Sequence, residues 1–137
     1  MKTTRFGVSM NDDLLEKLDS IVERRGYPNR SEAIRDLVRA ALVEDEWGTS
    51  TGEVLGVLVI VFDHHQRQLQ DRLTEIQHGC HHIIISSTHV HLDHDNCLEV
   101  IIVKGAAETV RSLADRLKAV RGVKSSELSA ASTGRNL

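Results

Sequence analysis

The sequence predicts an α+β protein made of two small parts. Residues 5–10 alternate polar and apolar side chains, which indicates a short strand, and the following residues have the apolar spacing of two helices. From residue 54 onward, apolar segments and amphipathic segments predict the order strand, helix, strand, strand, helix, strand. A polar, glycine-containing stretch, DEWGTSTGE (45–53), indicates a linker between the two parts.

The first part is predicted to fold as strand, helix, turn, helix. One helix is expected from Asp12 to just before Gly26, and a second after Asn29, whose side chain can cap it with Glu32 three residues further on. About 45 residues hold too little core to be stable alone, and a lone strand leaves its backbone groups unpaired. We therefore expect this strand to pair antiparallel with a second copy. Such a ribbon fits the major groove of DNA, and its outward face would carry Arg5, Gly7 and Ser9.

The second part is predicted to be a split βαβ arrangement of the ferredoxin-like type. Its expected strands and helices are 54–62, 66–77, 83–92, 97–105, 106–121 and 123–130. A four-residue polar turn, DHDN, joins the second and third strands and predicts a hairpin. The predicted division is a first domain at 1–46, a linker at 47–53, a second domain at 54–132 and a flexible tail at 133–137.

Composition narrows the class of protein. The formal net charge of -3 gives no general signature of a nucleic-acid binder, but five arginines lie between residues 24 and 39, so one face can still meet phosphates. No run of about 20 apolar residues is present, and the start is not an apolar leader, so we expect a cytoplasmic protein with no membrane association. No grouping of nucleophile, base and oxyanion donors stands out, so an enzyme is not expected.

The histidines predict a metal site. All eight lie between residues 64 and 94. His89 and His91 are two apart on a predicted strand and therefore face the same side, and Cys97 follows the turn and can face them across the hairpin. His78 is a candidate for a fourth ligand, in competition with His81 and His82.

Spacing alone leaves two questions open. Alternating histidines can also decorate a solvated strand face, and the donor set does not separate tetrahedral zinc from square-planar Ni(II) or Cu(II). Cys80 has two interpretations, an exposed thiol without a role or an accessory ligand for a soft metal. The three remaining histidines, His64, His65 and His94, are interpreted as solvated.

Two segments carry a resemblance to known families. The stretch PNRSEAIRDLVRAAL resembles the ribbon-helix-helix superfamily, and QH (77–78) with THVHLDHDNCLEV (88–100) resembles the nickel-responsive repressors of the NikR family. The resemblance covers nearly the whole chain in the right order. It implies a square-planar site for one Ni(II) per subunit, with His78 donated by another subunit to His89, His91 and Cys97, and with Glu99 supporting the ligands.

The resemblance also implies partners. Family members are homotetramers, dimers of dimers, in which ACT-like sensor domains form the centre and a swapped ribbon-helix-helix dimer lies at each end. Double-stranded operator DNA would be read by Arg5, Gly7 and Ser9 and anchored by the phosphate contacts of Asn29, Arg30, Ser31 and Arg67. A second cation site, usually holding K+, corresponds to Glu32 and Asp36, although these carboxylates can equally serve as a cap and as partners of nearby arginines.

The sequence therefore predicts a nickel-dependent, sequence-specific repressor of transcription, expected to control nickel-uptake genes. The alternative is an intracellular metal-storage or delivery protein that uses its ribbon only to dimerise. A repressor of the toxin-antitoxin type is a weaker interpretation, because the C-terminal part has the pattern of a folded domain.

Overall fold

The computed structural model describes residues 1–49, 52–135 and 137. The chain separates into two compact units, Met1–Ala41 and Leu42–Leu137. Residues 50 and 51, in the predicted linker, and residue 136, in the predicted tail, lie outside the described residues. Within the described part, no helix combines the length and the apolar character needed to cross a membrane.

The N-terminal unit is built on two helices, α1 (Asp12–Arg24) and the first part of α2 (Arg30–Gly48). The Asn11 side chain caps α1 by accepting a hydrogen bond of 2.8 Å from the backbone of the first turn. Gly26 follows the helix with a φ of 71°, a conformation that costs glycine little. The predicted cap of the second helix is also confirmed, because Asn29 Oδ1 accepts from the Glu32 backbone N–H at 2.8 Å.

The predicted N-terminal strand is not formed within a single chain. Residues 1–10 have no strand assignment, and Phe6 and Val8 are 76% and 54% exposed. A strand needs a ladder of backbone hydrogen bonds to a neighbour, and the described residues of one chain supply none here. Leu37 and Val38 of α2 are also exposed. The unit therefore presents both an unpaired strand-forming segment and an uncovered apolar helix face.

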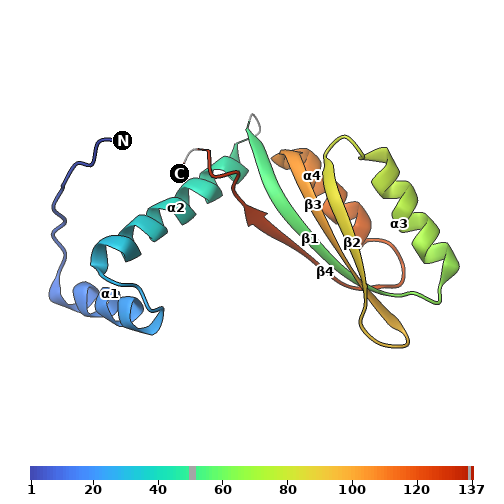
Figure 1. Cartoon of the computed structure of the whole chain (residues 1–137), viewed down its shortest axis with the longest axis horizontal. Coiled ribbons are helices and arrows are strands. Elements are labelled where there is room, and N and C mark those ends of the chain that lie inside the picture. The colour runs from blue at the N-terminus through green and yellow to red at the C-terminus, as the bar shows by residue number, and fades with distance from the viewer. Residues whose placement is uncertain (50–51, 136) are drawn as a thin grey trace. The chain divides into compact units, whose positions relative to one another are not determined.

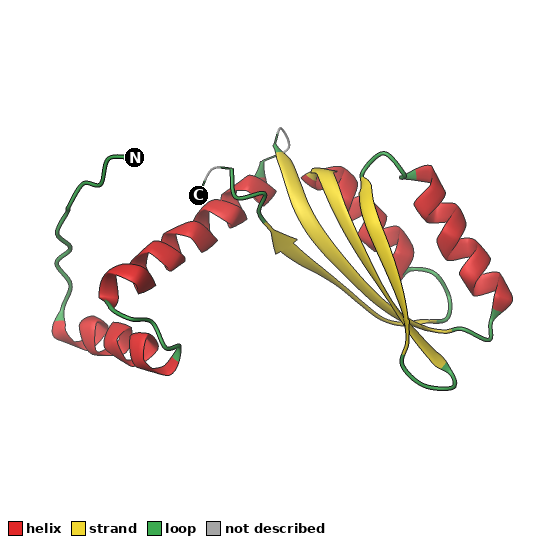
Figure 2. Cartoon of the chain, in the orientation of Figure 1, coloured by secondary structure: helices red, strands yellow, loops and turns green. Residues whose placement is uncertain are grey.

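The C-terminal unit has the predicted βαββαβ order. A four-stranded sheet has the order β2-β3-β1-β4 with every neighbouring pair antiparallel. Two helices cover one face of this sheet (Figures 1 and 2). The elements are β1 (Glu53–Asp63), α3 (Arg67–Gly79), β2 (Ile84–His91), β3 (Asn96–Ala106), α4 (Ala107–Lys118) and β4 (Val123–Ala131). The α+β fold class is confirmed, with these boundaries close to the predicted ones.

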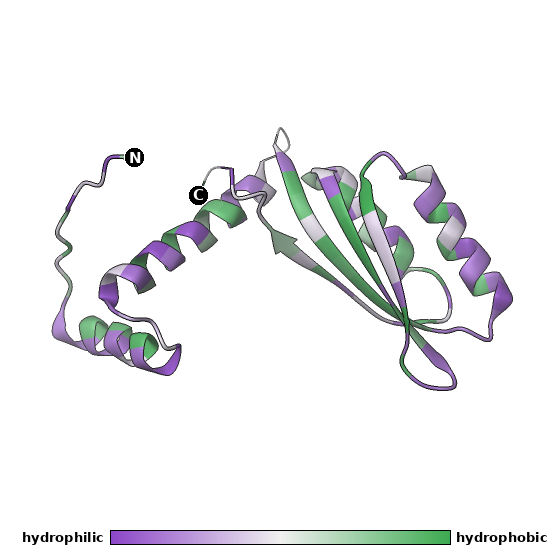
Figure 3. Ribbon diagram, viewed as in Figure 1, coloured by the Kyte–Doolittle hydropathy of each residue, from purple (hydrophilic) through white to green (hydrophobic). Residues whose placement is uncertain are grey.

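The core lies between the sheet and the two helices. In β1 and β3 every second residue is buried, because alternate side chains point to opposite faces of a sheet. Leu69, Leu73 and Ile76 of α3 and Val110, Leu113 and Leu117 of α4 cover the buried face. The central strands β1 and β3 are also apolar on their other face, whereas the helices are polar away from the sheet (Figure 3). The open face of β1 carries Leu55, Val57, Val59 and Val61, all half-buried.

The second helix continues further than the sequence indicated. The sequence predicts a linker that begins at residue 47, within a polar stretch that starts at residue 45, but α2 continues to Gly48. Trp47 is only 5% exposed, its Nε1 donates to the carbonyl of Ala131 at 3.2 Å, and the Arg111 guanidinium lies over its ring. Gly56 leaves room for the indole, since a Cβ there would approach Trp47 to 3.1 Å. Packing against the sheet therefore stabilises a helical turn that its polar sequence alone did not predict. The predicted domain boundaries as a whole stay a prediction.

The core position of Leu113 gives a test of this packing. We expect Leu113→Ala to lower the free energy of unfolding by about 2–5 kcal/mol, because it removes buried methyl groups and leaves a cavity beneath the sheet. The neighbouring exposed residue provides the control, and Ser112→Ala should change stability little. Urea unfolding followed by circular dichroism measures both, and equal stability of the two variants would contradict the described core.

Candidate metal centre

The pairing of β2 with β3 brings the three predicted ligands together. His91 lies opposite Cys97, and His89 lies opposite Glu99. Cys97 Sγ is 3.3 Å from His91 Nδ1, and one donor atom from each of His89, His91 and Cys97 lies within 4.8 Å of the others. Cys97 and Glu99 belong to the buried set of β3, so the group faces the helix-covered side of the sheet at its end. The alternative that His89 and His91 only decorate a solvated strand face does not account for the buried sulfur beside them.

The three donors differ in their surroundings. Cys97 is fully buried, whereas both histidines are exposed. The His89 ring contacts Phe62 edge-on, with 5.6 Å between the ring centroids. Burial, with a smaller effect of the Asp63 and Asp93 carboxylates, raises the pKa of the Cys97 thiol above its ordinary value. Without a metal, the sulfur is therefore a protonated thiol at neutral pH.

Glu99 is the buried carboxylate of this region. It is 8% exposed and accepts a hydrogen bond of 2.7 Å from the Ser87 hydroxyl. Ser87 is two residues before His89 on β2 and therefore lies on the same face. Glu99 thus holds the histidine-bearing strand against β3. Its role in supporting the metal ligands, which the resemblance implies, stays a prediction.

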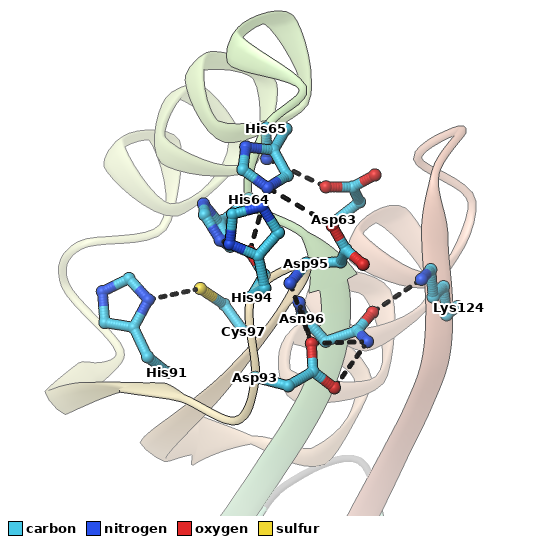
Figure 4. A network of polar contacts seen from close by, with 10 residues as sticks. All are labelled: Asp63, His64, His65, His91, Asp93, His94, Asp95, Asn96, Cys97 and Lys124. Atoms are coloured by element: carbon cyan, nitrogen blue, oxygen red, sulfur yellow. Dashed lines mark hydrogen bonds and ion pairs between the residues drawn. The ribbon is translucent and has the colours of Figure 1, made fainter.

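The turn between the ligands is held by Asp93 (Figure 4). Asp93 Oδ1 accepts from the backbone N–H groups of Asp95 and Asn96, each at 2.8 Å, and the Asn96 side-chain amide donates to both carboxylate oxygens. These hydrogen bonds favour the ionised form and lower the pKa of Asp93 to about 2. Lys124 Nζ donates to Asn96 Oδ1 at 2.6 Å. The turn that separates His91 from Cys97 is therefore tied both internally and to β4.

His78 is not part of this donor group. It lies near the end of α3, exposed, and lines a shallow pocket of about 320 Å³ with Glu99. The backbone carbonyl of His78 is 3.0 Å from His81 Nδ1, and His82 contacts His81 edge-on. Within the described residues, none of these three histidines approaches His89, His91 and Cys97 closely enough to complete the group. One chain thus supplies three donors, and the assignment of His78 as the fourth stays a prediction.

The carboxylates of the predicted second cation site have other partners. Glu32 forms ion pairs with Arg35 and Arg39, at 2.7 and 3.1 Å. Those hydrogen bonds lower the pKa of Glu32. Asp36 accepts a hydrogen bond from the Tyr27 hydroxyl, which raises the pKa of Tyr27. In the described part of the chain, no third metal-binding side chain joins these two carboxylates.

The predicted DNA contacts are exposed. Arg5, Gly7 and Ser9 lie in the N-terminal segment, and Arg67 is the first residue of α3. At the start of α2, Ser31 is exposed, and Arg30 makes a two-point ion pair with Asp19, at 2.7 and 2.9 Å. Arg30 is therefore oriented by α1 before any ligand arrives. The assignment of these residues to DNA stays a prediction.

Two features of the structure differ from what the sequence predicts. Cys80 is buried, not exposed, and its sulfur lies 3.8 Å from an Arg116 nitrogen, outside the donor groups of the described residues. His65, His94 and Asp95, interpreted as solvated or left without a role, form a second group of donors within 4.8 Å of one another. They come from two loops about 30 residues apart, and only the topology of the sheet shows that these loops meet.

The donor chemistry of the first group fits a borderline transition ion. Two imidazole nitrogens and one thiolate suit Ni(II), Zn(II) or Cu(II), and do not suit Ca2+ or Mg2+, which take oxygen ligands. A fourth ligand, such as a further imidazole, would complete a four-coordinate site for such an ion. Together with a helical unit that leaves a strand-forming segment unpaired, this site has the parts that the sequence predicts for one class of protein, a metal-responsive, DNA-binding regulator.

Comparison with known proteins agrees with this class and narrows it. Residues 55–131 match the model of the NikR C-terminal nickel binding domain, and residues 4–45 match that of the ribbon-helix-helix proteins of the copG family. The chain is 54% identical to a protein of Nitratidesulfovibrio vulgaris (strain Miyazaki F), 52% to one of Geobacter sulfurreducens and 50% to one of Pelobacter propionicus. Each is named as a nickel-responsive regulator, and each alignment covers 99% of this chain and 98% of the relative.

The chain therefore belongs to the NikR family of nickel-responsive regulators, which are not enzymes. Among solved structures, an uncharacterized protein of Thermotoga maritima has the same fold over 57% of this chain and 96% of its own length, with a TM-score of 0.53 and 15% identity.

The position of Cys97 predicts how nickel binding will behave. We expect Ni(II) to displace a proton from this thiol and to give a thiolate charge-transfer band, both of which Cys97→Ala should abolish. The loss of affinity should exceed the roughly 10–100-fold cost of removing an outer partner of a metal site. Calorimetry in buffers of different ionisation enthalpy, with absorption spectra, measures these effects. Cys80→Ala is the matched control and should retain both; loss of the band in that variant instead would place the metal elsewhere.

Proposed function

We propose that this protein is a nickel-dependent, sequence-specific repressor of transcription that controls nickel-uptake genes. The observation that carries the proposal is the convergence of His89, His91 and Cys97 in the same chain as a ribbon-helix-helix segment. A metal-binding sensor joined to a DNA-binding unit has the parts needed to make DNA affinity depend on an ion. Such a regulator works in the cytoplasm, where the operator and the incoming nickel are both present.

We further propose that His78 of a second subunit completes a square-planar site for one Ni(II) per subunit. Three donors come from one chain, and the two histidines among them are exposed toward solvent. His78 is itself exposed at the end of α3, and among the described residues it has no role in the core of its own unit. A ligand that crosses between subunits makes metal binding and assembly depend on each other.

A homotetramer follows from two incomplete surfaces. The N-terminal segment needs a partner strand, and its pairing with a second copy gives a swapped dimer. In the C-terminal unit, the sheet face opposite the helices carries Val57, Val59, Val100 and Ile102, all half-buried in a single chain. Pairing of this open sheet face with another dimer gives a closed dimer of dimers, which the family resemblance also implies.

Operator DNA would be read in the major groove by the outward ribbon residues Arg5, Gly7 and Ser9. The start of α2, with Asn29, Arg30 and Ser31, offers free backbone N–H groups and a positive helix end to a phosphate. Arg67 at the start of α3 would make a further phosphate contact after docking. Arg30 is already fixed by Asp19, so it would approach the DNA with little further loss of side-chain entropy.

We also propose that Glu32 and Asp36 can hold a potassium ion. The two carboxylates are one helical turn apart and supply the oxygen ligands that a hard cation prefers. Occupation by K+ would require Arg35 and Arg39 to release Glu32, so the cation competes with two ion pairs.

If metal binding and DNA binding are coupled, the affinity for the operator should depend on nickel. The operator for this test is a duplex that the nickel-loaded protein selects from a random pool. The affinity of the protein for this duplex should rise about 5- to 150-fold when stoichiometric nickel is added. Arg5→Ala should abolish specific binding and leave nickel binding intact, whereas Lys2→Ala, in the same exposed segment, should preserve both. Equal operator affinity with and without nickel would contradict the gating. Absence of any selected duplex would favour the metal-storage alternative.

A charge placed on the open sheet face should disrupt the proposed assembly. Val59→Lys places a charge in the middle of the apolar face, so we expect the tetramer to dissociate into smaller species, because burial of an unpaired ammonium is costly. Glu108→Lys, on the outer side of α4, is the matched control and should remain tetrameric. Light scattering after size exclusion gives the masses. A Val59→Lys protein with the mass of the parent would show that this face is not an interface.

A further inference from the structure

An open groove of about 690 Å³ lies between α3 and the end of α4. Three arginines line it, Arg72 from α3, Arg116 from α4 and Arg121 from the turn that follows α4. None of the lining residues belongs to the donor group at Cys97. The volume of the groove falls within the range of about 300–1,000 Å³ that is usual for sites of small organic molecules.

The positive charge of this groove is only partly balanced. Arg72 pairs with Glu75, three residues further along α3, at 3.2 Å. Arg116 approaches the sulfur of Cys80 at 3.8 Å, and within the described part of the chain Arg121 has no side-chain partner. The described lining residues include no carboxylate. Two guanidinium groups, which stay ionised at neutral pH, therefore face the groove without an acidic partner.

The rest of the lining suits a molecule with both polar and apolar parts. Gln66 and Gln68 add side-chain amides, which can donate hydrogen bonds to an oxygen. The apolar lining residues are Leu69 and Ile76, which are buried, and Val120, which is half-buried. A guanidinium group binds a phosphate or a carboxylate through two parallel hydrogen bonds, and apolar side chains favour contact with carbon atoms. The lining therefore matches an organic anion.

The groove is separate from the part of α3 that carries His78. Gln68, Arg72 and Ile76 are spaced by four residues and therefore lie along one side of α3. His78 lines a different pocket, together with Thr74. A ligand in the groove would leave free the side of α3 that the proposed nickel site uses.

We propose that this groove binds a small organic dianion, a phosphate monoester or a dicarboxylate, through Arg116 and Arg121. The site goes beyond the proposed function and does not depend on it. Like charges repel, so three guanidinium groups in one groove form an unfavourable arrangement that a bound anion would relieve. A DNA duplex is far larger than the groove and could contact only its rim. A ligand that contacts α3 and the end of α4 together would also fasten these two helices to each other.

Calorimetry on the metal-free, full-length protein tests the site with two probes, phenyl phosphate and phthalate, at about 0.15 M salt. We expect at least one of them to bind, whereas benzyl alcohol, which has the ring without the charge, should not. The double variant Arg116→Gln and Arg121→Gln should lower the affinity about 10-fold or more, because it removes charge-assisted hydrogen bonds. Lys118→Gln, which removes an exposed charge of α4 outside the groove, is the matched control and should bind as the parent does.

A second variant separates a shaped site from diffuse surface charge. Ala119→Trp leaves the net charge unchanged and places a large ring in the groove that Ala119 lines, so it should also abolish binding. Ser112→Trp, exposed on α4 outside the groove, is the control for the added ring and should retain binding.

The outcomes separate this site from the proposed repressor function. Binding of one probe alone supports the site and identifies the acidic group that it prefers. Failure of both probes, or unchanged binding in the double variant, overturns it. If neither probe binds and the double variant weakens operator binding instead, the arginines contact DNA, and this proposal fails while the repressor function stands. Anion binding in a protein whose operator affinity ignores nickel would reject the proposed function and leave this site in place.

Discussion

The pairing of β2 with β3 is the constraint on which the metal chemistry depends. Antiparallel strands place opposite residues on the same face, so the pairs His91 with Cys97 and His89 with Glu99 bring two imidazoles, a sulfur and a carboxylate to one end of the sheet. A shift of the register by one residue would turn the sulfur to the other face. Two interactions hold the register at this end, the Ser87–Glu99 hydrogen bond and the turn tied by Asp93.

A single chain is incomplete in three respects that have a common solution. Among the described residues, its N-terminal segment has no partner strand, its sheet has an apolar open face, and its donor group holds three ligands. Each of these features concerns a different surface, and the assembly proposed above would complete all three. Metal binding and assembly would then be linked, because an ion that takes ligands from two subunits stabilises only the assembled state.

Much of this structure could be predicted from the sequence because the signals are local. The apolar spacing of α3 and α4, the caps at Asn11 and Asn29, and the two-residue spacing of His89 and His91 are readable without the fold. The extension of α2 was not predicted, since it depends on the contact of Trp47 with a strand that lies more than 80 residues later in the chain. The group of His65, His94 and Asp95 was missed for the same reason, because its loops meet only through the pairing of β1 with β3. Burial of Cys80 likewise depends on packing between helices.

The contrast between the exposed histidines and the buried sulfur has a consequence for the order of events at the site. An ion that arrives from solvent meets the imidazoles first, and it must shed water before it reaches Cys97. The same burial shields the thiol from peroxide and from larger oxidants, which attack accessible thiolates most readily. Burial therefore makes the sulfur ligand less open to oxidation than an exposed thiol would be.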